Sequence, residues 1–280
     1  MANQLHTAAS NVSVLVPSVW SRSFYETLLT ALPFNSIINR NYEGEIQALG
    51  NTVKISTVPE FSDAEDLAEN ASADADAVTV TSQSLVINQQ TVKDFIVTDV
   101  ARLQSLPFVD ELQGMATYAI LKKIQADIIA DIAPSTSSPD HAIAYDSGTT
   151  LGLADILEAK ELLDEQNVPL PDRHCVLGSA QTNDIFNISN FTSSDFVSGS
   201  NLITSGVVGN PLLGFQPHMT TAVSSTSYFF HRSFYTMAAQ KGLTVKMFDL
   251  EVTGLRGVRL NTTTLWGKKQ LSNLRVVTIS

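Results

Sequence analysis

The side chains that most often do chemistry in proteins are few and widely separated in this sequence. There are five histidines, and they lack the spacing of a metal-binding motif: His6, His141, His174, His218 and His231. The sequence also lacks the short motifs of serine hydrolases, zinc proteases, phosphate-binding loops and dinucleotide-binding folds. We therefore expect surface or core histidines, no catalytic residue, no metal and no cofactor.

The single cysteine, Cys175, is also expected to be unreactive. One cysteine cannot form a disulfide within the chain, which favours a reducing compartment. The residue opens the apolar run Cys175–Leu177, a pattern typical of a small buried hydrophobe.

The most unusual chemistry is an acidic segment between Lys54 and Lys93, a stretch without any Lys or Arg. Its acids are Glu60, Asp63, Glu65, Asp66, Glu69, Asp74 and Asp76. A calcium-hand loop needs a central glycine, and residues 60–76 contain none. We interpret the segment as a solvated acidic loop, with weak cation binding at a subunit contact as the alternative. Gly206, Gly209 and Gly214 precede no helical pattern, so we expect turn glycines there and no phosphate site.

The acidic segment is flanked by two alternating runs that predict strands. Thr52–Val58 and a run from Ala77 alternate apolar and polar residues, which predicts a long hairpin with the acids at its end. An isolated hairpin is marginal in water, so this one needs a partner surface. Residues 1–50 hold little apolar material beyond a short helix at 21–29, and we expect an arm that lies on something else.

The longest helical pattern covers Val109–Ala133 and ends before Pro134. Leu121, Ile124, Ile128 and Ile132 share one face, and the helix would run roughly 37 Å at about 1.5 Å per residue.

The rest of the chain mixes helices and strands without an internal repeat. Polar residues 134–150 form a loop, and Thr149 or Thr150 is expected to cap the helix that follows. Further helices are expected at 99–105, 153–166 and 179–188, and strands at 91–97, 174–177, 228–231, 243–248, 257–265 and 274–279. The pattern predicts an α+β fold.

Composition excludes several classes of protein. The chain has 280 residues, a formal charge of −11 and a pI of about 4.8, which argues against sequence-specific nucleic-acid binding. It begins without a signal-peptide pattern and holds no apolar run long enough to span a membrane. We expect a cytoplasmic product with no membrane partner.

The order of these elements resembles the major capsid protein family of tailed bacteriophages, which has the Hong Kong ninety-seven fold. The family's entry to its extended loop is resembled by residues 40–45, which lead into residues 50–55. The approach to the family's spine helix is resembled by residues 92–105 together with Gln125–Ile129. The most specific piece is Leu162–Pro169 followed by Arg173–Leu177, which resembles the family's helix, turn and central strand. Residues 209–215, Trp266–Gly267 and Val276–Ile279 continue the likeness.

The resemblance implies a division of the chain. Residues 1–40 would be an N-terminal arm, and residues 41–95 would be an extended β-hairpin loop. A peripheral domain with the spine helix would consist of residues 96–144 and 263–280. Residues 145–262 would form an axial domain. It also implies a structural subunit of the virion that assembles into pentamers and hexamers of an icosahedral head. That head would enclose double-stranded DNA without binding its sequence, with a separate scaffolding protein and a portal as partners.

Contacts between copies are expected at the arm and hairpin, through charged residues: Arg40, Lys54, Glu60, Asp63, Glu65, Asp66, Glu69, Asp74, Asp76 and Lys93. Two alternatives remain open on the sequence. One is an encapsulin-like compartment with the same fold, which a cargo partner would favour. The other is an enzyme of α+β fold, which would gather titratable side chains in one pocket.

Overall fold

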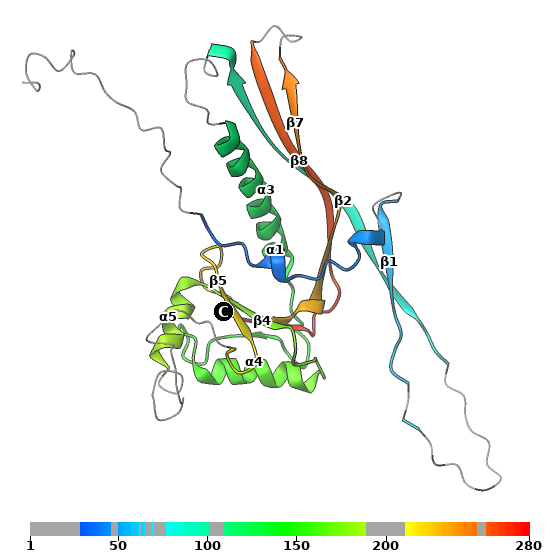
Figure 1. The fold of residues 1–280 in the computed structure, drawn as a ribbon. Coiled ribbons are helices and arrows are strands. Elements are labelled where there is room, and N and C mark those ends of the chain that lie inside the picture. The colour runs from blue at the N-terminus through cyan, green and yellow to red at the C-terminus, as the bar shows by residue number, and fades with distance from the viewer. Residues whose placement is uncertain are drawn as a thin grey trace, which may run out of the picture.

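The computed structural model describes residues 29–45, 50–61, 63–64, 66, 69, 77–100, 109–188, 211–250 and 256–280. Two sheets and one long helix organise them (Figure 1). The predicted helix at 21–29 lies almost wholly outside the described residues. Of the one predicted at 99–105, only Asp99 and Val100 are described, and both are helical.

The first sheet has four strands in the order β1-β2-β8-β7, all antiparallel neighbours. Its strands are β1 (Thr52–Thr57), β2 (Thr81–Thr98), β7 (Tyr235–Asp249) and β8 (Gly257–Gln270). Thr57 pairs with Thr81, which confirms the predicted hairpin. The separate strand expected at 91–97 is instead the second half of β2, because β8 takes over as its partner from Ile87 onward.

The handover from β1 to β8 requires a close approach of two backbones. Ile87 pairs with Gly267, and a β-bulge follows between Ile87 and Gln89. A Cβ on Gly267 would lie 2.3 Å from the Val86 carbonyl oxygen, so only glycine fits.

The long helix α3 (Val109–Asp131) confirms the predicted spine and ends before the expected Ala133. The reason lies in a distant part of the chain, because the Gln270 side chain forms hydrogen bonds with both backbone groups of Ala133. Its Oε1 accepts from the Ala133 N–H at 2.9 Å, and its Nε2 donates to the Ala133 carbonyl at 2.6 Å. Ile124 and Ile128 are buried against Trp266, while Leu121 and Ile132 are only partly buried beside them.

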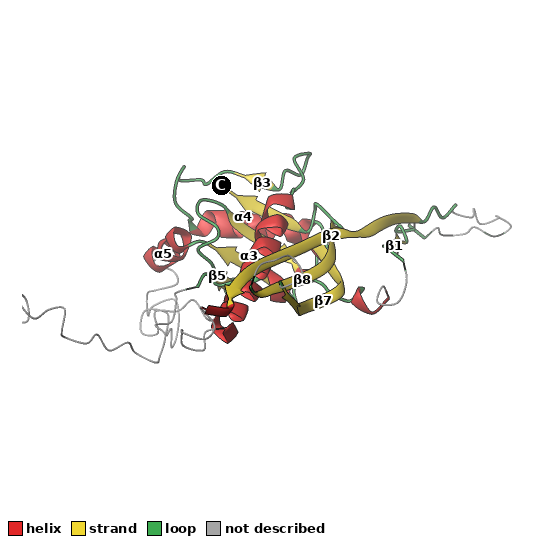
Figure 2. Cartoon of the chain, turned by 90° about the horizontal axis from the view of Figure 1, so that it is seen from above, coloured by secondary structure: helices red, strands yellow, loops and turns green. Residues whose placement is uncertain are grey.

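The second sheet is the middle layer of the body, seen from above in Figure 2. Its order is β3-β9-β6-β4-β5, with β3 (Ala142–Ile143), β4 (Arg173–Leu177), β5 (Gln216–Met219), β6 (Ser227–His231) and β9 (Val276–Ile279). Alternate residues of β6 face opposite cores: Phe230 packs with α3 and α1 (Phe34–Ile37), and Phe229 packs with α4 (Leu153–Glu165) and α5 (Ser179–Asn187). Burial on both faces explains the apolar run Cys175–Leu177 within β4.

The cap of α4 differs from the sequence expectation, and one of the predicted turn glycines is confirmed. Neither Thr149 nor Thr150 caps α4, because Asp155 does so from inside the helix, accepting from the Gly152 N–H at 2.6 Å. Thr150 instead bonds Ser147. Gly214 has a φ of +96°, which confirms a turn glycine, while Gly206 and Gly209 lie outside the described residues.

Candidate inter-subunit surface

The described parts of the extended hairpin project from the body (Figure 1). We use this name for β1, residues 58–80 and the first part of β2, up to Val86. Its base is anchored by a small core of Val53, Leu85, Ile87 and Ala238. Among the residues described beyond Thr57 and Thr81, no strand pairing joins the two arms. The stem carries exposed apolar side chains at Val58, Phe61, Val78 and Val80.

The acids of the hairpin are solvent-facing where they are described. Glu60, Asp63, Asp66 and Glu69 are exposed, and none forms an ion pair with another described residue. Glu65, Asp74 and Asp76 lie outside the described residues. Like charges that are not neutralised within the chain favour contact with cations from elsewhere.

The two lysines that flank the acidic segment are exposed but far apart. Lys54 lies on β1 opposite Ser84, and Lys93 lies on β2 opposite Thr262. The nine residue-to-residue steps of β2 from Ser84 to Lys93 span roughly 30 Å at about 3.3 Å per step. Neither lysine pairs with an acid among the described residues, so these two candidates form separate sites.

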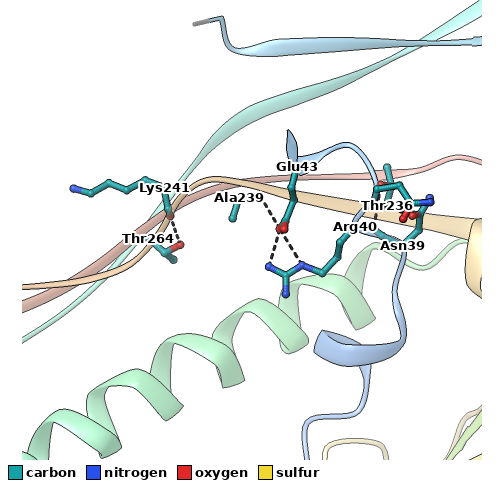
Figure 3. A network of polar contacts seen from close by, with 8 residues as sticks. Asn39, Arg40, Glu43, Thr236, Ala239, Lys241 and Thr264 are labelled. Atoms are coloured by element: carbon teal, nitrogen blue, oxygen red, sulfur yellow. Dashed lines mark hydrogen bonds and ion pairs between the residues drawn. The ribbon is translucent and has the colours of Figure 1, made fainter. Parts of the chain in front are cut away.

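Arg40 is held within its own chain. Its Nε and NH2 donate to Glu43 Oε1 at 2.9 and 2.7 Å, and the same oxygen accepts from the Ala239 N–H at 3.2 Å (Figure 3). Beside it the Asn39 carbonyl accepts from the Met237 N–H at 3.0 Å. The arm thus lies along the edge of β7 from Thr236 to Ala239, and Arg40 helps to fix it there.

Charged and polar residues that the sequence reasoning missed lie on the outer face of the first sheet. Asp94 accepts from Arg259 Nε at 3.0 Å and from Asn261 Nδ2. The exposed side chains of Val92 and Ile96 flank Asp94 on β2. The link between Asp94 and Arg259 joins positions 165 apart, and no local spacing signals it.

A pair of histidines on the second sheet was missed for the same reason. His174 Nδ1 lies 3.1 Å from His218 Nε2, on the neighbouring parallel strands β4 and β5. Burial lowers the pKa of His174 to about 4, with a further contribution from the charge of His218. Burial also lowers the pKa of His218. The pair is therefore neutral near pH 7 and serves as a hydrogen-bonded core contact.

Other candidate chemistry is accounted for by packing. Cys175 is fully buried, as predicted, and burial raises the pKa of its thiol.

An open groove of about 750 Å³ between β2 and the turn after β8 includes Asp131, Lys268 and Lys269 in its lining. Lys268 Nζ donates to the Asp127 carbonyl at 2.5 Å and lies 3.8 Å from Asp131 Oδ1, so it ties α3 to β8.

In the part of the chain that the structure covers, no group of three or more His, Cys, Asp or Glu residues is arranged to hold a metal ion. Within the same residues no helix has both the length and the apolar character to cross a membrane.

The described residues form a two-sheet body with a long helix and a projecting hairpin. The family model described as phage capsid protein matches residues 38–249, well over half of the sequence. The chain belongs to the phage capsid protein family. It is a structural subunit of a phage head and a component of the virion.

Solved structures share the fold over nearly the whole chain. A chain from a structure titled Mycobacterium phage Che8 is 23% identical, with a TM-score of 0.77 and coverage of 95% of this chain and 97% of that one. The capsid structure of cyanophage P-SCSP1u gives 13% identity, a TM-score of 0.80 and coverage of 100% and 96%. The acid-stable capsid structure of Helicobacter pylori bacteriophage KHP30 gives 12% identity and a TM-score of 0.74. The match covers 99% of this chain and 98% of that one. No curated protein matches the sequence.

Proposed function

We propose that this chain is the subunit that tiles an icosahedral phage head as pentamers and hexamers around double-stranded DNA. The observation that carries the proposal is the extended hairpin, whose stem exposes apolar side chains and whose acids have no cationic partner among the described residues. A heterologous contact, in which one patch binds a different patch on the next copy, generates closed rings when the rotation between copies closes. The family match favours a virus head over a metabolic compartment.

The proposed division of labour follows the two sheets. The second sheet with α4 and α5 forms the axial domain around the ring axis, and α3 with the first sheet forms the peripheral domain. β7 pairs with β8, and β8 pairs with β2, which supports assigning residues 235–262 to the peripheral body. This proposal differs from the division expected from the sequence, which assigned 145–262 to the axial domain.

The proposed role is purely structural and needs no cofactor. The net charge of −11 supports enclosing DNA without gripping it, because like charges repel. A separate scaffolding protein and a portal complete the proposed assembly. The candidate contacts remain those on the arm and hairpin, with Arg40 acting through its hold on β7.

Negative-stain electron microscopy of the concentrated full chain, with and without its scaffolding protein, tests the proposal. Closed shells, or rings of five and six copies, are the expected result. Compact monomers under every condition would contradict it.

A further inference from the structure

A small cavity lies between α3 and the first sheet, separate from the open groove beside β2. Its volume is about 150 Å³. The helix contributes Leu121 and Ile124 to its lining, and β7 and β8 contribute Met237 and Trp266. Ile124, Met237 and Trp266 are buried, so the inner wall of the cavity is apolar and shielded from solvent.

The outer end of the cavity is formed by the arm and by the middle of β7. Arg40 belongs to the arm, and Figure 3 shows it between the helix and the strand. Gly242 and Leu243 of β7 also line this end, and both are exposed. A Cβ built on Gly242 would meet no atom within 4 Å, so a small molecule can enter from this side.

The polar side chains of the lining are already hydrogen-bonded, with one exception. Arg40 donates to Glu43 Oε1 (Figure 3). Thr264 Oγ1 donates to the Lys241 carbonyl at 2.9 Å. Among the described residues that line the cavity, Asn35 alone carries a buried side-chain atom without a hydrogen-bond partner, and that atom is its Oδ1.

Size and polarity together define the molecule that fits. An apolar cavity of about 150 Å³ is large enough for benzene and stays dry. A buried water makes about three hydrogen bonds, whereas the lining offers one free acceptor, so water is a poor occupant. An aromatic ring packs well on the apolar wall beside Trp266, and one donor on that ring would satisfy Asn35 Oδ1.

We infer that this cavity binds a small aromatic molecule with a single hydrogen-bond donor, of the size and chemistry of phenol. The ring lies between α3 and the first sheet, and its hydroxyl donates to Asn35. A ligand in this place contacts the arm, the helix and the sheet at once, so it stabilises the folded chain by binding it. The site is separate from the extended hairpin and goes beyond the proposed structural role.

Phenol and toluene test the site, because they have nearly the same shape and only phenol carries a donor. The readout is the fluorescence of Trp266, which is the single tryptophan of the chain after Trp20→Phe. Bromobenzene quenches an indole that it touches through its heavy atom, and phenol or toluene displaces it. We expect saturable quenching, and phenol should bind about fivefold more tightly than toluene, which is the gain of one ordinary hydrogen bond.

Matched substitutions in this chain assign the binding to the cavity. Ala239 lines the cavity and pairs with Trp266, so Ala239→Leu fills the space and should abolish quenching. Ala126→Leu adds the same volume at an exposed position of α3 and should leave quenching unchanged. Asn35→Ala should keep the binding of both ligands and remove the preference for phenol.

Each result supports or overturns the inference. Quenching that does not saturate, that persists in folded Ala239→Leu, or that is also lost in Ala126→Leu would overturn the site. Equal affinities of phenol and toluene in the Trp20→Phe chain, or a preference that survives Asn35→Ala, would overturn the ligand class. Phenol and toluene are compared on the same variant, so this comparison stays decisive even where Ala239→Leu does not fold.

Discussion

At the scale of single residues, the turn after α4 depends on one buried cation. Arg173 is 1% exposed, and its guanidinium donates to the carbonyls of Val168 at 2.5 Å and Pro169 at 3.0 Å. It also pairs with Asp164 at 2.7 Å, a carboxylate that Lys160 reaches from the solvent side. The side-chain hydrogen bond from Lys160, together with the bond and charge of Arg173, lowers the pKa of Asp164.

Replacing the two cations should therefore have unequal effects. Arg173→Met leaves two buried carbonyls without their donor and should cost about 2–3 kcal/mol of unfolding free energy. Lys160→Met removes a surface pair and should cost less than about 1 kcal/mol. Urea unfolding of both variants measures the difference, and equal losses would contradict the role given to Arg173.

The histidine pair predicts a pH dependence of stability. The pKa of His174 is lowered from 6.5 to about 4 in the folded chain, so the unfolded chain binds more protons between these values. Stability is therefore full above about pH 6.5 and falls as the pH drops towards 4, by roughly 1–3 kcal/mol. His218, Asp172, Arg232 and His231 contribute charges around this site.

The contribution of His174 is isolated by substitution. His174→Gln keeps a polar group but cannot take up the proton, so its loss of stability between about pH 7 and about pH 5 should be smaller than that of the native chain. Urea unfolding at the two pH values provides the measurement. A variant as acid-sensitive as the native chain would assign the effect to other groups.

At the scale of elements, the crossing of β2 and β8 limits what the first sheet tolerates. Gly267→Ala would place a methyl group 2.3 Å from the Val86 carbonyl oxygen and 2.9 Å from the Ile87 Cα. Backbone atoms cannot step aside cheaply, so the variant should lose about 2 kcal/mol or more. Gly242→Ala, on β7 with open space around it, should change stability little. Thermal unfolding compares the two, and a tolerated alanine at position 267 would refute the crossing argument.

Elements with strong local patterns could be predicted from the sequence, and those set by distant partners could not. The hairpin and α3 follow from alternation and from helical spacing, and both are confirmed. The full length of β2 and the end of α3 depend on β8 and on Gln270, which lie more than a hundred positions away. The histidine pair likewise needs the parallel pairing of β4 with β5, whose residues are 44 positions apart.

The candidate surface was predictable in composition and less so in detail. Charge counting along the chain identified the acidic hairpin, and its described acids are exposed. The same counting grouped Arg40 with them, although its guanidinium is occupied by Glu43. The exposed stretch Lys241–Phe248 of β7 gives no local signal in the sequence, because its exposure follows from where residues 39–43 stop covering the edge of the strand.

At the scale of the whole molecule, the acids of the hairpin should matter for assembly and not for folding. Changing Glu60, Asp63 and Asp66 to their amides removes charges that contact no described cation, so unfolding free energy should hardly change. Assembly should slow and lose part of its salt dependence, because charge steers association and salt screens it.

Light scattering during assembly at several salt concentrations measures this effect. The matched control changes Glu158, Glu161 and Glu165 on α4 to glutamine, three exposed acids away from the hairpin. Equal slowing in both triple variants would assign the effect to net charge alone.

The continuity of β2 also has a mechanical consequence. One strand of 18 residues carries the hairpin at one end and lies in the sheet beside α3 at the other. Inter-strand hydrogen bonds stand perpendicular to the strands, so a pull along the hairpin loads the β2–β8 ladder in shear, with many bonds resisting together. If a flexible loop instead connected the hairpin to the sheet, the same pull would break the hydrogen bonds of the ladder one after another. The subunit is thus built to transmit tension between neighbours through its backbone.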